Sequence, residues 1–273
     1  MMFSNITDTK ISKKIVEIVS GNKNLSIGGG SFCVIAGPCS IENELQFSST
    51  ANFVTKNGAQ LLRGGVWKPR TSHKSFQGLG SVALELVKKI TTETNQGIVS
   101  EVMDPRDIEE LYPYVSLFQV GSRNMHNYSL LKELAQQDKP VLLKRGFASF
   151  VDEWIKSAEY IEQGGKASVI LCERGIRTFE TVTRNTLDLN SVAFIKHKTH
   201  YPIIVDPSHG VGVSLLVPDL ALAAAALGAD GIMVEVHPNP KEALSDGPQA
   251  LTFPQFEILM TKINRIIEIV GQK

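Results

Sequence analysis

The segment CVIAGPCSIENELQFSSTANFVTKNG, residues 33–58, contains the pattern from which the fold can be predicted. Its first residues, 33–37, are small or apolar, and Pro38 then interrupts the run. A stretch with helical periodicity follows and closes with Gly58, the residue type expected just past the end of a helix. The segment therefore predicts a buried strand, a short connection that carries Cys39, and a helix.

The same strand-helix order recurs along the chain. The predicted strands are 33–37, 61–67, 98–103, 117–123, 141–146, 168–175, 202–209 and 231–237, and helical stretches such as 152–165, 217–230 and 256–271 lie between or after them. Eight such units predict an α/β fold, a closed (β/α)₈ TIM barrel over residues 31–273. An open, doubly wound sheet is the structural alternative.

Residues 1–30 are predicted to be a short N-terminal extension outside the barrel. Within it, ISKKIVEIVSG (11–21) predicts a short helix. NLSIGGG (24–30) predicts a strand or hairpin that closes the bottom of the barrel.

The composition excludes several classes of protein. Lys plus Arg and Asp plus Glu number 28 each among 273 residues, so the net charge predicts neither nucleic acid nor an anionic membrane as partner. Three cysteines, an odd number, argue against a disulfide scaffold and for a reducing compartment. The start of the chain lacks the apolar core of a signal peptide, and no run approaches a membrane span of about 18 apolar residues. We therefore expect a cytoplasmic protein.

Charged residues gather where the predicted strands end, which is where a TIM barrel builds its active site. They are Arg63, Lys68, Arg70, Glu101, Arg123, Lys144, Arg145, Glu173, Arg174, Asp206, His209, Glu235 and His237. Each one alone could be solvated or paired with a neighbour. So many cations at one mouth of a neutral protein would nevertheless repel one another unless an anion binds there. Because arginine and lysine bind phosphate and carboxylate groups, the pattern predicts a ligand with more than one such group.

A second set of side chains comes from the first, seventh and eighth predicted strands and the loop after the eighth. It comprises Cys39, His209, Glu235 and Asp246. These strands are neighbours if the barrel closes, and thiolate, imidazole and carboxylates together suit a divalent transition metal better than magnesium or calcium. The residues alone leave Cys39 open as a metal ligand, a buried packing residue or a nucleophile. Cys33 and Cys172 lie inside strands and are expected to be packing residues.

Long motifs, in a fixed order, resemble one enzyme family. They are GPCSIEN (37–43), LLRGGVWKPRTS (61–72), SFQGLG (75–80), EVMDPRD (101–107), GSRNM (121–125), KPVLLKRG (139–146), LCERGIRTFET (171–181), TRNTLDL (183–189), IIVDPSHGVG (203–212), VEVHPNP (234–240) and ALSDGPQAL (243–251). Over residues 25–268 the chain resembles 3-deoxy-D-arabino-heptulosonate 7-phosphate synthase, in the short microbial (beta) branch of its type I enzymes. The resemblance implies condensation of phosphoenolpyruvate with D-erythrose 4-phosphate, the first step of the shikimate pathway toward chorismate and the aromatic amino acids.

The resemblance also implies roles for individual residues. It implies one divalent metal ion (Mn, Fe, Co or Zn) on Cys39, His209, Glu235 and Asp246, phosphoenolpyruvate on Arg63, Lys68, Arg123, Lys144 and Arg174, the aldose phosphate on Arg70 and Thr71, and Asp206 near the sugar hydroxyls. The expected catalytic residues are Lys144, as proton donor or orienting group, and Glu101, with the ligands Cys39 and His209. Glu101 would position the attacking water or, alternatively, pair with a cation.

Rival functions follow from the same residues. The sister enzyme, 3-deoxy-D-manno-octulosonate 8-phosphate synthase, uses arabinose 5-phosphate and typically reads K-A-N-R-S where this chain reads KPRTS (68–72), which favours the four-carbon aldose. A Schiff-base aldolase with Lys144 as nucleophile is a second rival. A non-catalytic scaffold would not need a complete metal shell.

Three residues depart from the pattern common in this family. His73-Lys74 stands where relatives commonly have Pro-Tyr, beside the residues that the resemblance assigns to the aldose phosphate, so the affinity for that substrate is less well predicted than the chemistry. Ser122 stands where relatives commonly have alanine. The family suggests a homotetramer or homodimer. About 30 leading residues leave little room for a regulatory module, so we expect little direct inhibition by phenylalanine or tyrosine. A separate chorismate mutase chain is then a candidate partner.

Overall fold

Eight parallel strands form a closed barrel in the computed structural model, which describes residues 11–68 and 72–272. The strands are β3 (Cys33–Gly37), β4 (Leu61–Arg63), β5 (Gly97–Glu101), β6 (Leu117–Val120), β7 (Val141–Lys144), β8 (Val169–Glu173), β9 (Ile203–Val205) and β10 (Gly231–Glu235). β10 pairs with both β3 and β9, so the sheet closes. The predicted TIM barrel is confirmed, and the open-sheet alternative is wrong.

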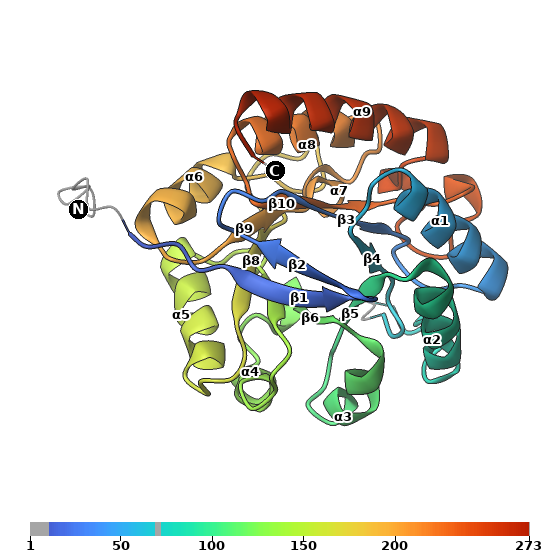
Figure 1. Ribbon diagram of the computed structural model, residues 1–273, viewed down its shortest axis with the longest axis horizontal. Coiled ribbons are helices and arrows are strands. Elements are labelled where there is room, and N and C mark those ends of the chain that lie inside the picture. Colours follow the sequence, from blue (N-terminus) through green and yellow to red (C-terminus); the bar gives the residue numbers. More distant parts are fainter. Residues whose placement is uncertain (1–10, 69–71, 273) are drawn as a thin grey trace.

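Helices surround the barrel and bury its outer face (Figure 1). They are α1 (Glu44–Lys56), α2 (Val82–Thr94), α3 (Asp107–Leu111), α4 (Tyr128–Leu134), α5 (Val151–Glu162), α6 (Leu189–Lys198), α7 (Pro207–Val211), α8 (Val217–Ala226) and α9 (Phe253–Ile269), with 3₁₀ turns η1 (Tyr112–Tyr114), η2 (Ser122–Asn124), η3 (Pro240–Glu242) and η4 (Gly247–Gln249). α1 begins where the Asn43 side chain accepts a hydrogen bond from the backbone of Gln46, and it buries Phe47 and Val54. None of these helices is long and apolar enough to cross a bilayer.

Several predicted strands end earlier than the sequence pattern indicated. The second stops at Arg63, and the seventh stops at Val205, after which α7 begins. Asp206 caps α7 by accepting a hydrogen bond from the backbone nitrogen of His209, 3.0 Å away. Asp206 therefore lies on a connection, because its side chain bonds the chain that follows instead of continuing the strand.

The N-terminal segment departs from its prediction. A hairpin of β1 (Val16–Ser20) and β2 (Lys23–Ile27) lies where a short helix was predicted for 11–21, so that prediction is wrong. Burial alternates along β1, with Val16 and Ile18 buried and Val19 exposed, which is the period of a strand. The reason is tertiary, because the inward-facing β-branched side chains pack into the interior of the barrel.

The hairpin covers the amino-terminal ends of the barrel strands. Val16, Ile18 and Ile27 share one buried cluster with side chains that point into the barrel, among them Cys33 and Cys172. Ser20 Oγ accepts a hydrogen bond of 2.7 Å from the backbone nitrogen of the first residue of β5. Figure 1 shows the hairpin crossing the barrel, so the carboxyl ends of the strands are left to form a site.

Candidate active site

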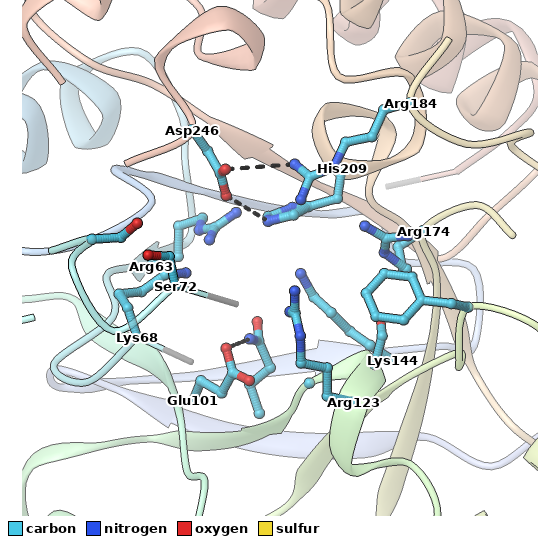
Figure 2. A pocket seen from close by; sticks show the side chains of 15 residues that line it. Arg63, Lys68, Ser72, Glu101, Arg123, Lys144, Arg174, Arg184, His209 and Asp246 are labelled. Carbon is cyan, nitrogen blue, oxygen red and sulfur yellow. Dashed lines mark hydrogen bonds and ion pairs between the residues drawn. The ribbon is translucent and has the colours of Figure 1, made fainter. Parts of the chain in front are cut away.

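A polar pocket of about 270 Å³ opens where the barrel strands end (Figure 2). Eight of the predicted site residues line it: Arg63, Lys68, Glu101, Arg123, Lys144, Arg174, His209 and Asp246. Cys39 and Glu235 lie buried beside it. Arg70 and Thr71 fall outside the described residues. The barrel therefore brings side chains from most of its strands to one place.

The four predicted metal ligands form a compact cluster. One donor atom from each of Cys39, His209, Glu235 and Asp246 lies within 4.8 Å of the others. Cys39 Sγ is 3.3 Å from Asp246 Oδ2, and His209 Nε2 is 3.3 Å from Glu235 Oε1 and 3.7 Å from Asp246 Oδ2. Sulfur, nitrogen and oxygen donors around one point are a ligand set for a divalent transition metal.

Two backbone features deliver these ligands. Gly37 has a φ of +152°, and a Cβ there would lie 2.2 Å from the carbonyl oxygen of Arg63, so only glycine allows this close approach of β3 and β4 before Cys39. Asp246 has a φ of +50°, in the left-handed region that aspartate tolerates better than most residues. The loops that carry Cys39 and Asp246 therefore each depend on a residue with a positive φ.

The electrostatics of the cluster fit a cation. Burial, followed by the charge of Glu235, raises the pKa of Cys39 to about 12, so the thiol keeps its proton until a metal displaces it. Burial lowers the pKa of His209 to about 4, which leaves the neutral imidazole that a metal requires. Glu235 Oε1 is buried without a hydrogen-bond partner of suitable geometry among the described residues. A divalent ion would satisfy that oxygen and offset both carboxylates.

Asp206 lies behind the cluster and not on the pocket wall. It is fully buried, and its Oδ2 lies 2.8 Å from His209 Nδ1 and 2.6 Å from Lys144 Nζ. Burial alone would raise the pKa of Asp206, but His209 and Lys144 hold it well below its usual value. The carboxylate fixes the proton on Nδ1 and turns Nε2 toward the cluster. This geometry favours an orienting role over the predicted contact with sugar hydroxyls.

Arg63 and Arg174 are cations buried at the base of the pocket. Arg63 Nη2 lies 3.1 Å from Glu235 Oε1, while its Nε and Nη1 are buried without a hydrogen-bond partner among the described residues. Burial lowers the pKa of Arg174 to about 10. Buried donors left unpaired cost free energy, so the arrangement favours a bound anion that accepts from them.

Glu101 reaches the pocket past a glycine. A Cβ at Gly121 would lie 2.0 Å from Glu101 Oε1, and Gln119 Nε2 donates to Glu101 Oε2 across 3.4 Å. The carboxylate is thus held against the pocket wall. Its geometry is compatible with both expected roles, a water-positioning group and a partner for the nearby cations.

Sequence reasoning missed several pocket residues and misplaced others. Phe147 and Arg184 line the pocket without having been predicted. The Phe147 ring stacks with Arg123 at 5.3 Å and Arg174 at 4.9 Å. Phe147 directly follows KPVLLKRG (139–146), and Arg184 lies in TRNTLDL (183–189), so position beside or within a motif was the available signal.

Arg145 and Glu173 do not line the pocket, although Arg145 directly follows β7 and Glu173 ends β8. Arg145 Nη1 lies 3.0 Å from Glu173 Oε2 and 2.8 Å from Asp188 Oδ2, and Asp188 is the N-cap residue of α6. Arg145 is thus paired with carboxylates outside the pocket, so the positive charge at the mouth comes from the other strand ends.

Comparison with known proteins agrees with this geometry. Residues 9–269 match the model of the DAHP synthetase I family. The chain is 46% identical over 250 residues to the phospho-2-dehydro-3-deoxyheptonate aldolase of Thermotoga maritima, an alignment that covers 92% of this chain and 74% of that protein. It is 31% identical to the 2-dehydro-3-deoxyphosphooctonate aldolase of Francisella tularensis subsp. holarctica, over 86% of this chain and 90% of that protein.

Solved structures extend the match to three dimensions. The crystal structure of the DAHP synthase of Thermotoga maritima superimposes with a TM-score of 0.91 at 43% identity, covering 96% of this chain and 76% of that one. A truncated form of the Thermotoga maritima synthase gives a TM-score of 0.87 at 40% identity and covers 96% and 95% of the two chains. By sequence, fold and motif order, the chain belongs to the DAHP synthetase I family.

Proposed function

We propose that this chain is a transferase that condenses phosphoenolpyruvate with D-erythrose 4-phosphate and water, giving 3-deoxy-D-arabino-heptulosonate 7-phosphate and phosphate. The observation that carries the proposal is one pocket with two chemically different parts. A ligand set of sulfur, nitrogen and oxygen lies beside the cations Arg63, Lys68, Arg123, Lys144 and Arg174. The relative from Thermotoga maritima, named as a deoxyheptonate aldolase, supports the choice of substrates.

The cations would bind and orient phosphoenolpyruvate. Arg63 and Lys144 are assigned to its carboxylate, and Arg123 and Arg174 to its phosphate. Arginine offers paired donors to each anionic group, and fixing two charged substrates side by side removes much of the entropy cost of their reaction. The buried, unpaired donors of Arg63 support this assignment, because they lack acceptors in the described protein.

C3 of phosphoenolpyruvate attacks the aldehyde carbon of the sugar phosphate, and the aldehyde oxygen takes up a proton to become a hydroxyl. Water adds at C2 and loses one proton. The carbon-oxygen bond to phosphate then breaks as the hydroxyl on C2 becomes the keto group, and its proton leaves with the phosphate. Lys144, held 2.6 Å from Asp206, would place a proton donor beside the phosphoenolpyruvate portion. Glu101 would orient the water. Arg70 and Thr71 remain the assigned holders of the aldose phosphate.

Cys39, His209, Glu235 and Asp246 would hold one divalent metal ion, which when bound supplies a Lewis acid for the aldehyde oxygen. The mixed donor set suits Mn, Fe, Co and Zn alike, so cellular supply would decide among them.

The aldose is tested by phosphate release. Purified, metal-replete protein is incubated with phosphoenolpyruvate and either erythrose 4-phosphate or arabinose 5-phosphate. We expect a kcat/KM at least about 10-fold higher with the four-carbon sugar. A preference for arabinose 5-phosphate would instead support the activity that the 31% identical Francisella protein is named for. Loss of activity on borohydride treatment with a carbonyl substrate would point to a Schiff base on Lys144.

We also propose a cytoplasmic homotetramer or homodimer, on the strength of the family resemblance. A separate chorismate mutase chain stays a candidate partner. Size-exclusion chromatography with light scattering tests the oligomer directly.

A further inference from the structure

A short segment between β8 and α6 is fastened to the helix that carries His209. The segment is TRNT, residues 183–186. The backbone nitrogen of Arg184 donates to the Val211 carbonyl oxygen across 3.0 Å, and that of Asn185 donates to the Gly210 carbonyl oxygen across 3.0 Å. The Asn185 side chain donates to the carbonyl oxygen of His209 across 2.9 Å. The segment is therefore fixed relative to the imidazole in the cluster.

The side chain of Arg184 reaches from this segment to the other side of the cluster (Figure 2). Its Nη1 donates to Gln249 Oε1 across 2.6 Å and lies 3.6 Å from Asp246 Oδ1. Gln249 is 2% exposed, and its Nε2 donates to Glu235 Oε2 across 2.7 Å. Arg184, Gln249 and Glu235 thus form one chain of hydrogen bonds.

The direction of this chain is fixed by chemistry. A guanidinium can only donate, and an ionised carboxylate can only accept. The carboxamide of Gln249 between them must therefore turn its oxygen to Arg184 and its NH₂ to Glu235, because the flipped amide would face both partners with the wrong group. Because only one orientation of the Gln249 carboxamide satisfies both neighbours, Gln249 holds the Glu235 carboxylate in one position.

Each carboxylate of the cluster turns one oxygen to this support and the other to the remaining predicted ligands. Gln249 bonds Glu235 Oε2, while Oε1 faces His209 Nε2 at 3.3 Å and Arg63 Nη2 at 3.1 Å. Arg184 faces Asp246 Oδ1, while Oδ2 lies 3.3 Å from Cys39 Sγ. The same division of oxygens occurs at two ligands from different loops.

We propose that Arg184 and Gln249 are positioning residues that hold Glu235 and Asp246 so that each presents one oxygen to the metal ion. The inference rests on the metal site of the proposed function and adds two residues to it that act through the predicted ligands. Groups that orient metal ligands through hydrogen bonds typically change metal affinity by about 10- to 100-fold when removed. We expect losses in this range.

The experiment measures binding of Co²⁺ alone to metal-stripped protein, by titration followed through the cobalt-thiolate absorption band. The first variant is Gln249→Met, which keeps the length of the side chain and removes both hydrogen bonds. The Kd for Co²⁺ should rise about 10- to 100-fold. The shape of the absorption band should also change, because a Glu235 carboxylate without its support can rotate.

Arg184→Met separates positioning from simple electrostatics. Removing a positive charge close to the cluster would by itself tighten binding of a cation. The proposal predicts the opposite, a weaker affinity, because Gln249 loses its hydrogen-bond donor and Asp246 loses its ion-pair partner. The double variant should lose less than the product of the single losses, since both residues act through one chain. Arg177→Met is the matched control, because Arg177 belongs to the same loop and stacks on Phe147 instead, and its Kd should not change.

The outcomes separate this proposal from the proposed function. If wild-type protein binds no Co²⁺, both the metal site and the positioning roles are wrong. If wild type binds and both variants bind with the same Kd and spectrum, only the positioning roles are wrong. If Gln249→Met does not fold, Arg184→Met decides alone, because its partly exposed side chain can be replaced without opening the core.

Discussion

Two cysteines six residues apart occupy different chemical environments. Cys33 lies in the interior cluster beneath the hairpin, whereas Cys39 Sγ lies 3.3 Å from Asp246 in the ligand cluster. We predict that Cys39→Ala loses metal affinity by more than about 100-fold, beyond the effect typical of a supporting residue, and loses turnover with it. Cys33→Ala should keep both. Mass spectrometry measures the metal content, and phosphate release measures the turnover. Full metal-dependent turnover in Cys39→Ala would show that Cys39 is a packing residue.

Phe147 links the arginines assigned to the phosphate. Its ring stacks with Arg123 and Arg174, and each such contact contributes on the order of 0.5–2 kcal/mol. Phe147→Ala should raise the KM for phosphoenolpyruvate about 10-fold with a smaller change in kcat, because the arginines lose their orientation but keep their charge. Phe179→Ala, at a side chain that is 98% exposed, is the control. An unchanged KM in Phe147→Ala would remove this orienting role.

Strand order explains which residues of the site could be predicted from the sequence. Cys39, His209, Glu235 and Asp246 could be grouped from sequence because closure of the barrel makes their strands neighbours. The hydrogen bonds of Arg184 and Gln249 could not be predicted, because they depend on how two long connections pack across the mouth of the barrel. Strand order fixes which loops meet, while side-chain contacts between loops follow from the tertiary structure.

The hairpin is the element on which sequence and structure disagree most. In residues 11–21, Ile15, Ile18 and Val19 have helical spacing, while Val16 and Ile18 have the spacing of a strand. Both patterns are present, and the propensities of so short a segment decide little. Contact with the barrel interior selects the strand, so Ile15 and Val19 stay exposed.

Stability tests the hairpin as an element. Ile18→Ala removes a side chain that is 1% exposed, and the free energy of unfolding should fall by about 2–5 kcal/mol. Val19→Ala, at the exposed neighbour, should change it by less than about 0.5 kcal/mol. Urea denaturation followed by circular dichroism gives both values. The KM for phosphoenolpyruvate should stay at its wild-type value in both variants, because the hairpin lies at the other end of the barrel. If Ile18→Ala were as stable as the wild type, the hairpin would not seal the core.

At the scale of the whole molecule, the closed barrel converts a scattered sequence pattern into one site. Charged residues from strand ends far apart in the chain line one pocket, and the interior below it is filled by apolar side chains. The alternation of strands and helices predicted this architecture. It did not predict that Arg145 pairs with Glu173 outside the pocket, because adjacent residues at a strand end point to opposite sides.

The central claim is that one divalent metal ion on Cys39, His209, Glu235 and Asp246 is required for the condensation. The most direct measurement is titration of metal-stripped protein with Mn²⁺, with phosphate release from phosphoenolpyruvate and erythrose 4-phosphate recorded at each addition. We predict no turnover without metal, and activity that rises to a plateau at one ion per chain. Full turnover in the stripped protein, or stripped protein that binds metal without gaining activity, would contradict the claim.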